Sequence, residues 1–350
     1  MKRLFPSTQE RVRGVLFGLV AGDKNHGPQA MGIMVGKALI DNKKNSSTLE
    51  MKVPSSERYS LEFNQLLTNI LKNYLHWYHS KSKGWYDTGQ IGKEIFDKFK
   101  SGDFNGESND VKELETQLYE VAIVVRQLDN QLNGQTGGIN PAHRNVVLSM
   151  YNRISDDDLL KMAKEETRLT HYSVFACEAA QMQNYICRRY IKMNISENEP
   201  RLSILAVCKE FVENNQLSKE FKNSLNQVLE NKEFLSGDSN AIALLRKSIS
   251  RGGFSPQTLA SALYFIILHT MLMENEYTSE REMAVSCLLD SFQFAGSANY
   301  CPVLVGPILG SMFGDSVFFN NSESEDDLLS HSKRMEEALE VCTELADMWN

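Results

Sequence analysis

Five short stretches of this chain place polar side chains beside glycines or turns. They are Gly22-Asp23, WYDTG (85–89), GGINPAHRN (137–145), Thr170-His171 and AGSANYCPVLVG (295–306). These stretches carry carboxylates, imidazoles and a guanidinium, which supply a general base, hydrogen-bonding groups and a phosphate ligand. The last stretch reads either as the remains of a metal-binding loop or as a turn that never did chemistry.

Three of these polar residues have a structural interpretation beside the chemical one. Asp23 ends a helix, where the helix dipole disfavours a carboxylate, so it either contacts a ligand or forms a plain turn. Asp87 is either a lone general base or the N-cap of a helix beginning near Gln90. Asn299 either contacts a ligand or caps the helix that follows it.

The remaining candidates also have both a functional and a structural interpretation. Arg144, which follows His143 after the glycine loop, either grips a phosphate through two hydrogen bonds or forms a surface salt bridge. His171 precedes a long buried helix, so it is either a ligand contact or a hydrogen-bonded structural histidine. Cys301 lies near a helix N-terminus, which favours a thiolate, but no neighbouring base is evident and a packed thiol is the alternative. The acidic run after Ser155 is interpreted as a helix start rather than a metal site.

The elements that position these residues are predicted to be helices, because apolar residues recur with a helical period along nearly the whole chain. Strand patterns are nearly absent, and neither an internal repeat nor a clear domain boundary is found. Residues 1–350 are therefore predicted to form one all-α domain. The predicted helices cover residues 10–22, 28–41, 59–79, 109–130, 157–167, 172–192, 201–213, 219–230, 256–272, 280–293, 302–314 and 327–348.

Local signals refine some helix ends. Ser255 followed by Pro256 predicts an N-cap with proline in the first turn, and Ser279 with Glu282 has the spacing of a capping box. The polar segments 41–57, 193–200 and 320–327 are predicted to be surface connections. Pro307 lacks a backbone donor and is expected to kink its helix.

Glycines recur at every fourth position in two places. Gly14, Gly18 and Gly22 form one row, and Gly306, Gly310 and Gly314 form the other. Glycine in a helix interior costs about 1 kcal/mol relative to alanine, so such rows indicate close backbone approach, to another helix or to a ligand. We expect the two rows to pack against each other at the centre of the domain.

Composition excludes several classes of function. The net charge is −8 and the basic residues are scattered, which argues against a nucleic-acid groove or a polybasic membrane patch, so the expected partner is a small molecule. No stretch is expected to span a bilayer, and charges beside the short N-terminal apolar run argue against a signal peptide. A cytoplasmic protein is predicted. The six cysteines are expected to be buried, reduced thiols: Cys177, Cys187, Cys208, Cys287, Cys301 and Cys342.

Taken in order, the five stretches resemble motifs of the ADP-ribosylglycohydrolase family. RVRGVLFGLVAGD (11–23) resembles its opening helix ending in Gly-Asp, and WYDTG its Thr-Asp-Asp-Thr turn. GGINPAHRN resembles its Gly-Asn-Gly loop, and LTHYSVFACEAA (169–180) its Thr-His before an alanine-rich helix. AGSANYCPVLVGPILGSMFG (295–314) falls without a gap on its Gly-Gly-Asp-x-Asp-Thr loop. GDKNHGP and NYCPVLVG look closer to a divergent branch, the jellyfish J-type crystallins.

The resemblance implies a large orthogonal helical bundle that cleaves glycosidic bonds of ADP-ribose, with two Mg²⁺ ions held by carboxylates. Here the two aspartate positions of the late loop are Ser297 and Asn299, and the first of the early turn is Tyr86. No acidic residue stands between Asp23 and Asp41. Magnesium requires hard oxygen ligands, so the binuclear site is predicted to be absent and no cofactor is expected.

The resemblance also implies which residues line the site. Asp87 is the catalytic candidate, and the expected substrate-binding residues are Asp23, Asn25, Thr88, Gly138, Asn140, His143, Arg144, His171, Ser297, Asn299 and Tyr300. The expected function is binding of an ADP-ribose- or nucleoside-type ligand, with hydrolysis weak or lost. The alternatives are a non-catalytic, crystallin-like structural protein or pseudoenzyme and, if these residues lie far apart, an unrelated helical scaffold. Whether the protein is an enzyme, and its oligomeric state, stay open.

Overall fold

A computed structural model of the protein describes residues 6–49, 55–80, 88–193, 203–319 and 335–349. Apart from one isolated bridge between Gly138 and Phe254, these residues contain no β-structure, which confirms the all-α prediction. The first half of the chain forms α1 (Thr8–Gly22), α2 (Gly27–Leu49), α3 (Ser55–His79), α4 (Gln90–Phe96), η1 (Ser101–Asp103), α5 (Val111–Gln131), α6 (Asn140–Asn145), η2 (Val146–Met150) and α7 (Asp156–Thr167). The second half forms α8 (Val174–Ile191), α9 (Ile204–Asn214), α10 (Lys219–Leu229), α11 (Lys232–Leu235), α12 (Ser239–Ser248), α13 (Ser255–Glu276), α14 (Glu280–Ala295), α15 (Pro302–Phe313), η3 (Asp315–Val317) and α16 (Met335–Asp347).

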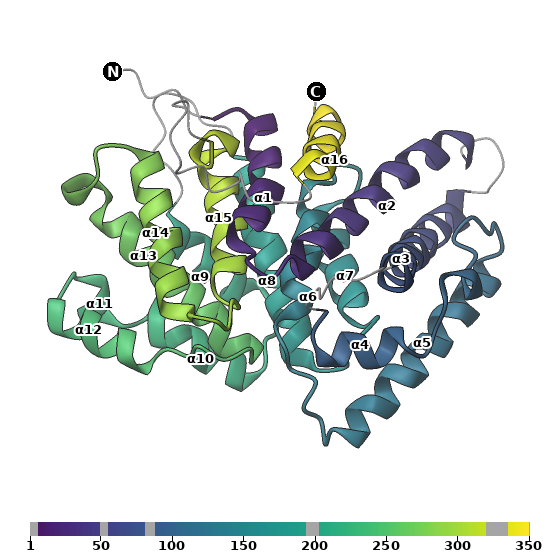
Figure 1. The fold of residues 1–350 in the computed structure, drawn as a ribbon, viewed down its shortest axis with the longest axis horizontal. Helices are drawn as coiled ribbons and strands as arrows, with labels where there is room; N and C mark the ends of the chain where they lie inside the picture. Colours follow the sequence, from purple (N-terminus) through teal and green to yellow (C-terminus); the bar gives the residue numbers. More distant parts are fainter. Residues whose placement is uncertain (1–5, 50–54, 81–87, 194–202, 320–334, 350) are drawn as a thin grey trace.

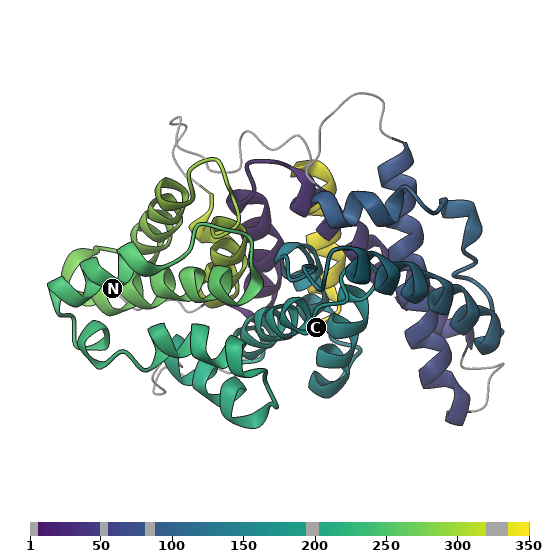
Figure 2. The ribbon, with the colours of Figure 1, turned by 90° about the horizontal axis from the view of Figure 1, so that it is seen from below.

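Helix α1 is the central element of the bundle. In Figures 1 and 2 it lies between α9–α14 on one side and α2–α5 on the other. Nearly all of α1 is buried, including its glycines, because other helices cover it on every side. Its end at Asp23 is therefore held at the middle of the molecule.

The two glycine rows do pack against each other. A Cβ added to Gly18 would collide with the backbone oxygen of Gly306, and one added to Gly14 with that of Gly310. These contacts are with backbone rather than with movable side chains, so only glycine allows α1 and α15 to lie this close. The pairing fixes the end of α1 beside the loop that precedes α15.

Several helix ends confirm the sequence signals. Ser155 accepts a hydrogen bond from the Asp158 backbone N–H, so the acidic run is a helix start. Ser279 caps α14 as predicted, although the Glu282 carboxylate accepts from the Thr278 N–H rather than from the cap itself. The cap predicted at Ser255 is wrong by one residue, because Ser255 is already helical and Phe254 occupies the N-cap position.

Other elements differ from the prediction. The polar stretch 41–49 continues α2 instead of forming a connection, because Asn42 is buried and donates to the Tyr151 hydroxyl at 3.3 Å, while Lys44 pairs with Glu344 of α16. Helices α6, α11 and α12 are not among the predicted ones; α6 and α11, with six and four residues, are too short to show a period. Much of segments 193–200 and 320–327 lies outside the described residues.

We expected no segment long and apolar enough to span a bilayer, but one helix, α13, meets that test of length and composition. Residues 255–273 of α13 are long and apolar enough to cross a bilayer, with a mean hydropathy of 1.3. Within the described residues this is the one such helix, and 72% of the window is buried inside the protein. A core helix passes the same test of length and composition.

All six cysteines are buried and none forms a disulfide, as expected. Burial raises the pKa of the Cys301 thiol, and the nearby charge of Asp290 adds to that shift. The interpretation of Cys301 as a reactive thiolate is therefore wrong, and the packed thiol is right.

Candidate functional site

Asp23 and Asn299 join the first and last of the five stretches directly. The Asn299 side-chain amide donates to Asp23 Oδ1 at 3.1 Å, and its oxygen accepts from the Lys24 N–H at 3.4 Å. The Asp23 carboxylate also accepts three backbone N–H groups, from Asn25, His26 and Gln29, at 2.9 to 3.1 Å. Asp23 thus closes the turn into α2 and anchors the late loop, and burial raises its pKa despite these bonds.

The cap predicted at Asn299 is not found. The N-cap position of α15 belongs to Cys301, and Asn299 has a left-handed backbone with φ of +54°. Asparagine tolerates this conformation better than most residues do. Its amide points back at Asp23, so its role in the described structure is to bridge two loops.

The glycine loop at 137–145 meets the same late loop. His143 Nε2 donates to the Tyr300 carbonyl at 2.9 Å, and the two rings lie stacked with centroids 6.5 Å apart. Burial lowers the pKa of His143 to about 3, so the imidazole is neutral and acts as a hydrogen-bond donor. Tyr300 also lies against Gly253, where an added Cβ would lie 3.0 Å from its ring.

His171 reaches the glycine loop from another direction. A Cβ added to Gly138 would lie 3.3 Å from His171 Nε2. Thr170 Oγ1 accepts from Arg144 and lies 2.8 Å from His171 Nδ1, to which we assign the hydroxyl proton of Thr170. Burial, with the positive charge of Arg144, lowers the pKa of His171 well below 6.5. His171 is thus a neutral imidazole with its N–H on Nε2, facing Gly138.

Arg144 is fully buried and bound inside the protein. Its Nε donates to Glu166 Oε1 at 2.7 Å, and both side chains have no exposed surface. Tyr74 and Asn145 donate to the same carboxylate, each at 2.8 Å. The expected salt bridge exists, but in the core rather than at the surface, and Nη1 of the guanidinium is buried without a hydrogen-bond partner.

Thr88 and Asn140 bring the early turn to the same region. Thr88 is buried, and a Cβ on Gly89 would lie 2.9 Å from Asn140 Nδ2. The side-chain oxygen of Asn140 is buried and has no hydrogen-bond partner. Helix α4 begins at Gln90 as predicted, but its N-cap position belongs to Gly89, so the interpretation of Asp87 as the N-cap is wrong. Asp87 itself, the catalytic candidate, lies outside the described residues.

The predicted convergence therefore holds for the described parts of all five stretches. Asn25 is partly exposed and Ser297 and Tyr300 are exposed, so these residues lie on the solvent side of the junction. Sequence reasoning missed His26, whose Nδ1 accepts from the Gln29 side chain at 2.8 Å, and Gly253. The run GDKNHGP contained the signal for His26, since a residue before Gly-Pro sits in a turn.

The donor set supplied by the described residues does not fit two magnesium ions. Asp23 supplies a carboxylate, but its oxygens are bonded to three backbone N–H groups and to the Asn299 amide. The oxygen of Asn299 accepts from Lys24, and Ser297 offers a hydroxyl. No three His, Cys, Asp or Glu side chains within the described ranges gather as a metal site. Magnesium needs near-octahedral oxygen ligands, which these groups do not supply.

Comparisons with known proteins identify the family and the fold of this chain. A sequence profile of the ADP-ribosylglycohydrolase family matches residues 29–320, so the chain belongs to that family. A solved structure described as an "ADP-ribosylglycohydrolase-related protein complex" is similar over 98% of this chain and 99% of that one, with a TM-score of 0.58 and 15% identity. At that identity the likeness shows the fold. No curated protein matches the sequence.

Proposed function

We propose that the junction of the five stretches binds a small ligand of ADP-ribose or nucleoside type. The observation that carries the proposal is the direct bonding between loops 276 residues apart, Asp23 to Asn299, together with the His143 bond to Tyr300. Such bonds hold the junction in place before a ligand arrives. A preorganised site binds without first ordering its loops.

The polar groups left at this junction suit a ribose or a phosphate. The buried oxygen of Asn140 lacks a partner, and a buried acceptor left unpaired costs about 1–3 kcal/mol until a donor fills it. The Nε2–H of His171 is a fixed donor, and Ser297 and Tyr300 offer exposed hydroxyls. A ribose hydroxyl both donates and accepts, so it matches an unpaired acceptor beside such donors.

Hydrolysis by this protein is proposed to be weak or lost. The family's reaction uses two metal ions to orient the substrate and activate water. The described donors around Asp23 do not fit such a pair. Any remaining turnover would have Asp87 as general base.

A second candidate is a non-catalytic structural protein of crystallin-like type, or a pseudoenzyme. The bond between Asp23 and Asn299 favours it, because these two side chains are engaged in stabilising the fold. The buried free thiols fit a reducing compartment, so a cytoplasmic location is part of either proposal.

Isothermal calorimetry distinguishes the two candidates. ADP-ribose, adenosine and NAD are titrated into the full chain, with magnesium and then with EDTA. Ligand binding independent of magnesium supports the first candidate, and absence of heat up to millimolar ligand contradicts it. Mg²⁺-dependent release of ADP-ribose from a modified protein would contradict both.

One variant tests the proposed contact. Asn140→Ala removes an acceptor that bonds nothing in the protein, so stability should change little while affinity falls about tenfold, or 1.4 kcal/mol. Asn130→Ala, at the exposed end of α5, is the matched control and should leave affinity unchanged.

A further inference from the structure

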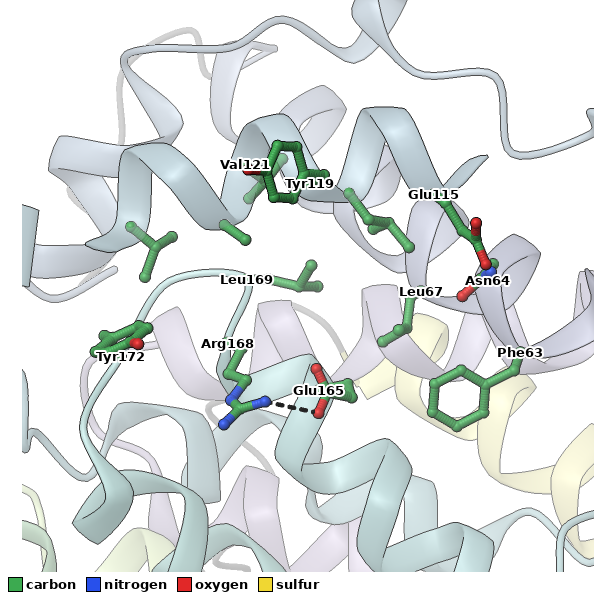
Figure 3. Close-up of a pocket in the computed structure, with 13 residues that line it drawn as sticks. Phe63, Asn64, Leu67, Glu115, Tyr119, Val121, Glu165, Arg168, Leu169 and Tyr172 are labelled. Carbon is green, nitrogen blue, oxygen red and sulfur yellow. Dashed lines mark hydrogen bonds and ion pairs between the residues drawn. The ribbon is translucent and has the colours of Figure 1, made fainter. Parts of the chain in front are cut away.

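A second hollow lies between α3, α5 and the chain that runs from the end of α7 toward α8. Its volume is about 480 Å³, within the rough range of 300–1,000 Å³ of small-molecule sites. Its lining contains none of the residues assigned to the junction above. Figure 3 shows α5 on one side of the hollow and the Glu165–Arg168 turn on the other.

The walls of this hollow are apolar and aromatic. Leu67, Val121 and Leu169 are buried side chains that line it. Tyr119 and Tyr172 also line it, and they are 67% and 44% exposed, unusually so for large rings. Such rings offer large contact area at a small entropic cost when a flat ligand covers them.

The charge in the hollow is unbalanced. Arg168 pairs with Glu165 at 3.0 Å, which leaves these two side chains neutral together. Glu115 forms no ion pair with any described residue, and in Figure 3 it lies beside Asn64 at one end of the hollow. The lining therefore carries a net charge of −1, from one arginine and two glutamates.

We propose that this hollow binds a small aromatic amine. The ring lies against Tyr119, Tyr172 and Leu169, and the ammonium group lies at the Glu115 end. A ring-bearing cation is favoured twice, by apolar contact with the walls and by attraction to the unpaired carboxylate. The face of Tyr119 adds attraction for a cation, whereas the Tyr172 ring already has the Arg126 guanidinium 5.9 Å from its centroid, away from the Glu115 end.

The probe is 1-naphthylmethylammonium, followed by its fluorescence on the full-length protein. Two analogues of the same shape accompany it, neutral 1-naphthylmethanol and anionic 1-naphthoate. We expect saturable 1:1 binding of the ammonium, weaker binding of the alcohol and the weakest binding of the acid. Glu115→Gln should weaken the ammonium about threefold to fivefold and leave the alcohol unchanged, as an exposed charge contributes at most about that much.

A variant whose side chain fills the hollow tests the proposal sterically. Ala122 lines the hollow from the exposed side of α5, so Ala122→Phe occupies the space without touching the core, and binding should fall at least tenfold. Ile123→Phe, at the neighbouring exposed position outside the lining, is the matched control and should bind as the wild type does. Equal binding by Ala122→Phe and the wild type, binding of the acid as tight as the amine, or no saturation at millimolar probe would each overturn the proposal.

Discussion

Asn299→Asp places a second carboxylate against Asp23. The two side chains lie 3.1 Å apart, so at an effective dielectric constant of about 20 two full charges repel by roughly 5 kcal/mol. One carboxyl can take up a proton instead, which limits the penalty. At pH 7.5 this proton uptake costs about 1.4 kcal/mol for each pH unit above an ordinary aspartate pKa of about 3.9, which is again about 5 kcal/mol. We expect a loss of about 3–5 kcal/mol once the loops relax.

Thermal unfolding in EDTA measures this loss. An unfolding entropy of about 2.1 cal/mol/K per residue over 350 residues converts 3–5 kcal/mol into a Tm lowered by roughly 4–7 °C. The repulsion raises the pKa of one carboxyl in the folded protein, so the folded state holds a proton that the unfolded state has released. Stability relative to the wild type therefore falls as pH rises through that raised pKa and recovers toward pH 5.

Asn299→Ala is the control, because it removes the hydrogen bond to Asp23 without adding a charge. Its loss should be smaller at pH 7.5 and should not change between pH 5 and 7.5. The reasoning is refuted if Asn299→Asp is as stable as the wild type at pH 7.5 in the absence of divalent ions. That result would mean the two side chains are not held together.

Three further outcomes follow from the packing. Gly18→Ala forces a Cβ into the Gly306 backbone and should lower the free energy of unfolding by about 3 kcal/mol or more in a denaturation assay. Gly102→Ala should be neutral in the same assay, because no atom lies within 4 Å of the added Cβ. Glu166→Ala leaves Arg144 buried without its ion-pair partner and should lower the free energy of unfolding by about 3–5 kcal/mol. Glu165→Ala, which breaks the exposed pair with Arg168, should lower it by at most about 1 kcal/mol, and equal losses would speak against a buried network. His171 should keep a neutral Nε2–H ring from pH 5 to 8 by ¹⁵N NMR, and a titration in that range would disprove the assigned tautomer.

Local patterns predicted the frame of the molecule well. The helical period gave most of the long helices, and the two glycine rows predicted the α1–α15 contact because backbone collisions forbid any side chain there. The order of five motif-like stretches predicted the junction. The helical period and each glycine row lie within a few turns of one helix, whereas the five stretches had to be taken together.

Interactions between distant residues were not predictable in the same way. Asn299 was expected to cap its own helix or touch a ligand, but its partner is Asp23, 276 residues earlier. Arg144 looked available for a phosphate because nothing nearby in sequence marked Glu166 as its buried partner. The polar end of α2 looked like a connection because α16, which carries Glu344, lies at the other end of the chain. A side chain's role in such cases depends on what the fold brings to it.

The most direct test of the central claim is a crystal structure of the protein with ADP-ribose and Mn²⁺, which gives anomalous signal where Mg²⁺ does not. The account predicts ligand density beside Asn140, Ser297 and Tyr300, with Asp23 still bonded to Asn299 and no pair of ordered cations between them. Two well-ordered metal ions at Asp23 and Asn299, or ADP-ribose bound elsewhere on the molecule, would contradict it.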